Sequence, residues 1–169
     1  MFKKFILAAI IAVASITSHA QNALKFGTVN LDEVMQAMPE TAVLEKELST
    51  RTQNFQNQAK TMQDEFQSKY QAYVEQHDSL DELTRGVRED ELRSLQQRAE
   101  QYQQMSYQQI SQYREQQLAM IQEKLFKAVT AVGDREKYVA IFPLNEATYY
   151  SAELTTNVTA LVKTELGIK

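Results

Sequence analysis

The chain has 169 residues, no cysteine, two histidines and a formal net charge of −4. The absence of cysteine excludes disulfide bonds, thiol nucleophiles and cysteine metal sites, and so few histidines argue against a histidine triad or a multi-histidine metal site. The acidic balance argues against a nucleic-acid partner and against strong docking onto an anionic membrane, because phosphate binding depends on clustered Lys and Arg.

Residues 1–20 have the pattern of a cleaved signal peptide. Lys3 and Lys4 form a basic start, residues 5–16 are an apolar stretch, and Ser18 and Ala20 are small residues at the positions that a signal peptidase reads. We therefore expect cleavage after Ala20 and export to the periplasm. The alternative, an uncleaved membrane anchor, is less favoured because the apolar run is shorter than the about 20 residues that span a bilayer.

The next segment, residues 21–39, predicts a strand followed by a short helix. Residues 24–30 partly alternate and carry aromatic and β-branched side chains, which is typical of a strand. Asn30, with Glu33 three residues later, has the spacing of a capping box and predicts a helix that begins at Leu31. Pro39 ends this helix and is acceptable in the first turn of the next one.

Residues 40–133 are long, polar, rich in Gln and almost free of Gly and Pro. Apolar residues recur there every seven positions in two series, which are Leu48, Phe55 and Met62, and Ala59, Phe66, Tyr73 and Leu80. The pattern resumes after an interruption, which predicts two antiparallel helices of roughly 40 to 45 residues each. We expect them to form a coiled-coil-like helical hairpin.

The turn of this hairpin is expected near residues 77–90. Ser79 and Glu82 have the spacing of a second capping box, and Gly86 lies close by. Because the apolar stripe is thin and contains Tyr and Met rather than mostly Leu, it buries little apolar area. The arm should therefore be flexible, and its stability should come from a body built by the two ends of the chain.

The last segment, residues 134–169, predicts the rest of that body. Residues 138–142 form a nearly continuous apolar strand that Pro143 ends, and residues 147–151 are expected to form a second strand. Thr155 or Thr156 is expected to cap a last helix. A small sheet with exposed edges tends to pair with another chain, so we expect an oligomer.

The predicted fold is α+β and mostly α, with a long helical hairpin on a small β body. In order, the parts are a signal peptide (1–20), the first strand and short helix (21–39), the hairpin arm (40–133) and the C-terminal strands and helix (134–169). The order of these parts resembles the Skp/OmpH family. The residues that carry the resemblance are Phe26-Gly27-Thr28-Val29-Asn30, Met38-Pro39-Glu40, the Gln-rich hairpin, Tyr138-Val139-Ala140-Ile141-Phe142 and Thr148-Tyr149-Tyr150.

This resemblance implies a trimer in which the strands of three subunits form the body and three hairpins enclose a cavity. Unfolded outer-membrane proteins would be held in that cavity without ATP, and no catalytic residue, metal or cofactor is implied. The resemblance assigns to the body and its subunit contacts Phe26, Val29, Val139, Ile141, Phe142 and Tyr149.

Aromatic and Met side chains on the arm are candidates for binding such clients, since they adapt to many partners. The candidates are Phe55, Met62, Phe66, Tyr70, Tyr102, Met105, Tyr107 and Ile110. Alternatively, most of them hold the two helices of the hairpin together. Met105 and Tyr107 cannot both share the stripe of Tyr102 and Ile110, so one of them should face the cavity or solvent.

The expected tip differs from the basic tips of well-known family members. It carries six acidic residues against two arginines, the acids being Asp78, Asp81, Glu82, Glu89, Asp90 and Glu91 and the arginines Arg85 and Arg88. Capture of clients or lipopolysaccharide by a positive tip is therefore not expected, and membrane contact should be weak or absent. An enzyme is not expected, because no phosphate loop, metal spacing or nucleophile–base set is present. The alternative function is a structural or adaptor coiled coil of the cell envelope.

Overall fold

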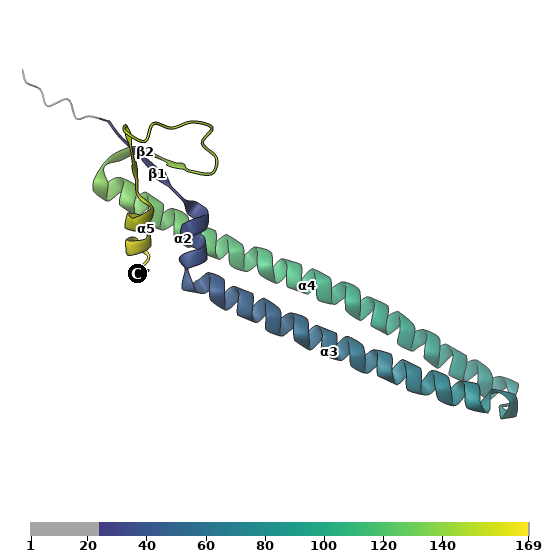
Figure 1. Cartoon of the computed structure of the whole chain (residues 1–169). Helices are drawn as coiled ribbons and strands as arrows, with labels where there is room; N and C mark the ends of the chain where they lie inside the picture. Colours follow the sequence, from purple (N-terminus) through teal and green to yellow (C-terminus); the bar gives the residue numbers. More distant parts are fainter. Residues whose placement is uncertain (1–23, 169) are drawn as a thin grey trace, which may run out of the picture.

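A computed structural model describes residues 24–168 of the chain. The expected signal peptide and its cleavage after Ala20 lie outside the described residues. A small three-stranded sheet with short helices lies at one end, and two long helices, α3 and α4, extend from it side by side (Figure 1). We call the sheet, the short helices and the adjoining end of α4 the body. Helix α3 and the remainder of α4 form the arm. The mostly helical fold with a small sheet was predicted and is confirmed.

The sheet joins both ends of the chain. Strand β1 (Lys25–Val29) lies in the middle, between β2 (Tyr138–Pro143) and β3 (Thr155–Asn157), and both pairings are parallel. The pairing of β1 with β2 skips one residue, since Lys25 pairs with Tyr138 and Phe26 with Ala140. A bulge of this kind changes the alternation of side chains along the strand. Tyr138 and Ile141 therefore both pack against the core, whereas Val139 is 58% exposed.

The expected strand at residues 147–151 is wrong. These residues belong to the connection between β2 and β3, in which Tyr149 is 85% exposed, and the third strand is Thr155–Asn157. A run of Thr and Tyr suits a strand only where it finds a pairing partner. Here the free edge of β1 pairs with Thr155–Asn157 instead.

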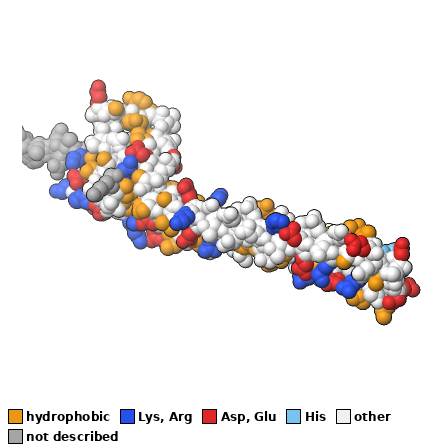
Figure 2. Space-filling view, turned by 60° about the horizontal axis from the view of Figure 1, so that its bottom comes forward, with side chains coloured by type: hydrophobic (Ala, Val, Ile, Leu, Met, Phe, Trp, Pro, Cys, Tyr) orange, Lys and Arg blue, Asp and Glu red, His pale blue; other side chains and the backbone are white. Residues whose placement is uncertain are grey.

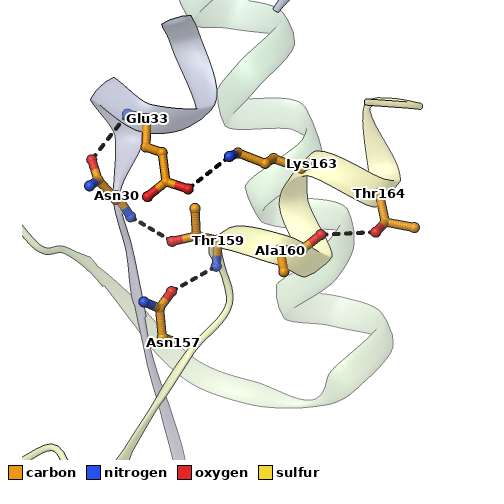
Figure 3. Close-up of polar contacts among 7 residues, drawn as sticks. All are labelled: Asn30, Glu33, Asn157, Thr159, Ala160, Lys163 and Thr164. Carbon is orange, nitrogen blue, oxygen red and sulfur yellow. Dashed lines mark hydrogen bonds and ion pairs between the residues drawn. The ribbon is translucent and has the colours of Figure 1, made fainter. Parts of the chain in front are cut away.

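Short helices α2 (Leu31–Ala37) and α5 (Thr159–Glu165) are joined by polar contacts that Figure 3 shows. The cap that was predicted at Asn30 is confirmed, because its side-chain oxygen accepts a hydrogen bond from the Glu33 N–H at 3.1 Å. The Asn30 N–H donates to Thr159 Oγ1 at 2.9 Å, and Lys163 pairs with Glu33 at 2.7 Å. These contacts tie the start of the described chain to its end.

The start of the last helix differs from the expectation. Thr155 and Thr156 lie in β3, and α5 begins at Thr159, whose N–H donates to Asn157 Oδ1 at 3.0 Å. The body core combines α2, the start of α3, the C-terminal part of α4, β1 and the last segment. It consists of Val29, Val34, Met38, Leu44, Ile121, Leu125, Ala128, Val132, Val158 and Val162.

Helix α3 (Pro39–Gln76) has 38 residues and α4 (Glu82–Glu136) has 55. At 1.5 Å per residue, α4 is about 80 Å long. A short 3₁₀ helix, η1 (His77–Ser79), lies in the turn between them. The expected capping box of Ser79 and Glu82 is wrong, because the Asp81 carboxylate caps α4 by accepting from the Thr84 N–H at 2.9 Å.

Candidate functional site

A groove lies midway along the arm, between α3 and α4. Its volume is about 270 Å³. The residues that line it are Thr52, Phe55, Gln56, Ala59 and Gln63 of α3 and Ala99, Tyr102, Gln103, Ser106, Tyr107 and Ile110 of α4.

The groove is hollow because small side chains meet there. Ala59, Ala99 and Ser106 occupy positions at which a larger side chain would fill the space between two packed helices. Ser106 is buried, and its hydroxyl donates to the Tyr102 carbonyl oxygen of its own helix at 2.7 Å. The Ser106 donor is therefore already used within α4, and the groove keeps a mostly apolar floor.

Aromatic side chains form part of that floor and its rim. The rings of Phe55 and Tyr102 meet edge to face, with their centroids 5.9 Å apart. Tyr107 is 67% exposed at the rim, and Ile110 is half-buried. Aromatic pairs of this geometry stabilise the contact between the helices and still present apolar edges to a ligand.

No side chain that lines the groove carries a charge. Within the flanking stretches, residues 52–63 and 95–113, the only charged residues are Lys60, Arg98 and Glu100. On the face that Figure 2 shows, charged side chains lie in separate groups along the arm, with uncharged surface between them. The lining of the groove is thus uncharged, and the stretches of helix around it carry few charges.

Charged contacts between the two helices lie on either side of the groove. On the tip side Lys69 pairs with Glu91, and on the body side Lys124 pairs with Glu40. The hydrogen bond from Lys69, helped by Arg88, lowers the pKa of the Glu91 carboxyl, and the hydrogen bond from Lys124 lowers the pKa of Glu40. These charges already have partners within the arm.

A second tip-side contact joins the helices through a tyrosine. The Tyr73 hydroxyl donates to Glu89 at 2.6 Å, which raises the pKa of Tyr73. Together with the ion pairs, this contact holds the helices on both sides of the groove.

The structure brings four of the eight candidate client-binding residues together, since Phe55, Tyr102, Tyr107 and Ile110 all line the groove. The other four do not line it. Met62 and Phe66 are half-buried closer to the tip, and Tyr70 stacks on Phe66 with ring centroids 6.1 Å apart. Met105 is 51% exposed outside the groove, so both Met105 and Tyr107 are accessible.

Sequence reasoning missed the three glutamines of the groove, Gln56, Gln63 and Gln103. In a Gln-rich helix each of them resembles its neighbours, so the only signal was the local scarcity of charge. It also missed a second groove of about 460 Å³ at the body end of the arm, where Val43 and Met120 are exposed.

The six residues assigned to the body fall into two groups. Val29 is buried in the core of its own chain, and Ile141 packs against that core, so Val29 is not accessible to another subunit. On the other face of the sheet Phe26 stacks on Phe142, with ring centroids 6.4 Å apart. Val139, Phe142 and Tyr149 are exposed, and β2 and β3 each pair on one side only.

Among residues 24–168, no three His, Asp or Glu side chains gather in a way that could hold a metal ion. His77 contacts Asp78 at the turn of the arm and lies edge-on to Tyr73. In the same described range, no helix is both long enough and apolar enough to cross a membrane.

Comparisons with known proteins identify a family and a solved structure with a similar fold. The sequence model of a family described as outer membrane protein (OmpH-like) matches residues 25–166. A solved structure from Caulobacter crescentus, described as a candidate outer membrane chaperone (OmpH-like), has a TM-score of 0.75 and 9% sequence identity. The similarity covers 85% of this chain and 83% of that chain. A comparison with curated proteins gave no significant match.

Proposed function

Because the chain belongs to the OmpH-like family, we propose that it is a periplasmic chaperone that holds unfolded outer-membrane proteins without ATP. The description of the structural neighbour as an outer membrane chaperone supports the same role. The observation that carries the proposal is the neutral groove midway along the arm, which offers apolar side chains to a ligand where the helices leave space. Adaptable aromatic contacts of this kind suit a protein that binds many unfolded partners.

We also propose that three copies assemble through the body, so that three arms surround the client. The sheet has two strands that each pair on one side only, and Val139, Phe142 and Tyr149 expose apolar surface beside them. An open sheet edge next to apolar side chains is a common place for another chain to pair. The number three rests on the family resemblance.

The arm itself supports a holding role through its thin packing. Outside the body core, Leu95 and Ser106 are its only buried side chains in the described chain. Stability per residue is low where few apolar contacts are buried, so the arm can bend around clients of different size. A rigid spacer would need strong apolar residues at every repeating position.

The test is native mass spectrometry of residues 21–169, alone and after dilution of a urea-unfolded outer-membrane β-barrel protein into the sample. We expect a trimer that takes up one client molecule and keeps it soluble. A monomer or dimer, or a trimer that lets the client aggregate, would contradict the proposal. Either result would favour the alternative, a structural or adaptor coiled coil of the envelope.

A further inference from the structure

We infer that the groove midway along the arm binds an extended, uncharged, aromatic-bearing segment of the client, and that its glutamine amides hydrogen-bond to the client backbone. This inference rests on the proposed holding function and names the part of the client that the arm recognises. The amides are those of Gln56 and Gln63 on α3 and Gln103 on α4.

The absence of charge in the groove lining selects against charged client segments. A charged side chain that left water for this groove would find no charged partner among the lining residues, and burial of an unpaired charge is costly. The ion pairs that join the helices on either side of the groove, Lys69 with Glu91 and Lys124 with Glu40, are already satisfied. The segment that matches this lining is therefore neutral.

The amides of the groove are free to bind a ligand. Each Gln side chain offers two N–H donors and a carbonyl acceptor. Two glutamines elsewhere on the arm use their amides within their own helix, since Gln71 donates to Glu75 and Gln96 to Glu100, each at 3.1 Å. Within residues 24–168 no comparable hydrogen bond engages the three groove glutamines.

An extended client backbone presents the groups that these amides can pair. Its N–H and C=O groups have no partners within the strand and must be satisfied when they leave water. Gln56 and Gln63 are seven residues apart on α3, which is about 10 Å along the helix or about three residues of extended chain. Amides from both helices can thus follow one strand along the groove.

The apolar floor suits the side chains of such a segment. Alternate side chains of an extended strand point to the same side, so every second one can reach Phe55, Tyr102 and Ile110. Strands of membrane β-barrels alternate apolar and polar residues and carry aromatic residues near both membrane surfaces. An unfolded outer-membrane protein therefore contains many segments with this chemistry.

The test replaces amides by a side chain of similar length that cannot hydrogen-bond in the same way. The variant combines Gln56→Met and Gln103→Met, and the matched control combines Gln53→Met and Gln108→Met, which lie outside the groove lining. Gln and Met have similar helix propensities, so both variants should fold alike. Circular dichroism and native mass would verify this.

The probes are two fluorescently labelled peptides with alternating Tyr and Thr. One has an ordinary backbone, and the other is N-methylated at alternate residues. Binding of each peptide to the full assembly is measured by fluorescence anisotropy. We expect the groove variant to bind the ordinary peptide about tenfold more weakly, because two hydrogen bonds are lost, and the control to change less than twofold. The N-methylated peptide should bind weakly to every variant. Equal or tighter binding by the groove variant would show an apolar adhesive surface and would overturn the inference.

The same samples separate this inference from the proposed function. If the wild-type assembly keeps the urea-diluted β-barrel protein soluble while the groove variant binds the peptide normally, the inference fails and the holding function stands. If the wild-type assembly does not keep the barrel protein soluble, the proposed function itself fails. A groove variant that loses both peptide binding and part of the holding activity supports both.

Discussion

The Thr159 hydroxyl is the buried polar group that joins the two ends of the body. Thr159 is 5% exposed, and its Oγ1 accepts a hydrogen bond from the Asn30 N–H at 2.9 Å (Figure 3). A buried donor that loses its partner costs more free energy than an average hydrogen bond contributes. This one contact therefore couples the N-terminal cap of α2 to the start of α5.

We predict that Thr159→Val lowers the free energy of unfolding by about 1–3 kcal/mol, because Val keeps the shape but leaves the Asn30 N–H without an acceptor. Urea unfolding at a fixed protein concentration would measure it, since assembly affects apparent stability. Thr164→Val is the matched control, because the Thr164 hydroxyl donates only to the Ala160 carbonyl oxygen and is exposed. Equal losses for the two variants would contradict the role of the Asn30 contact.

At this scale, contacts between residues close in the sequence could be predicted, and contacts between residues far apart in the sequence could not. The Asn30 cap depends on residues three positions apart, so its spacing alone was sufficient. The start of the last helix depends on β3, which pairs with β1 from the far end of the chain. Nothing near Thr155 indicates that partner, and the cap was placed too early.

At the scale of elements, ion pairs hold α3 and α4 together on the tip side of the groove. Lys69 and Arg88 both contact the Glu91 carboxylate, which stabilises its charged form and lowers its pKa. A carboxyl whose pKa is lower in the folded state contributes stability that is present above its unfolded pKa, near 4.5, and is lost as pH falls through the folded value. The contribution of this ion pair to the stability of the arm should therefore be lost in acid.

We predict that Glu91 titrates below pH 4.5 in the folded protein and that Lys69→Met moves its pKa back toward that value. Arg88→Met should have a smaller effect, because the Lys69 hydrogen bond is the larger cause of the shift. The midpoint is measured from the carboxyl carbon chemical shift of Glu91 during an NMR titration. A larger effect of the Arg88 change would show that the contact across the two helices is not the main one.

The helices were easier to predict than the groove between them. Apolar residues every seven positions define a long helix by a local rule, and one of these series contains Phe55, which lines the groove. The hollow depends on which small residues face each other across two helices, and that depends on the register between segments about 40 residues apart. Ala59, Ala99 and Ser106 do not reveal their positions in the groove before the helices are paired.

At the scale of the whole molecule, one side of the sheet packs against the body core and the other side is only partly covered. Gly27, Val29 and Ile141 lie on the side of the body core, where a side chain at Gly27 would come within 3.1 Å of Ile141. Phe142 and Val139 remain exposed beside strands that each pair on one side only. A single chain therefore buries the core-facing side of its sheet and leaves an apolar surface at Phe142 and Val139 that another copy can cover.

We predict that Val139→Asp raises the dissociation constant of the proposed assembly by at least about tenfold, because a charge that enters an apolar interface loses water without gaining a partner. The substitution should not unfold the single chain, since Val139 is 58% exposed in it and sits at the bulge. Val43→Asp is the matched control, because Val43 is 57% exposed on the arm, away from the sheet. Sedimentation velocity over a concentration series measures both variants. An unchanged mass for Val139→Asp, or an equal loss for Val43→Asp, would show that the exposed sheet surface is not the contact between subunits.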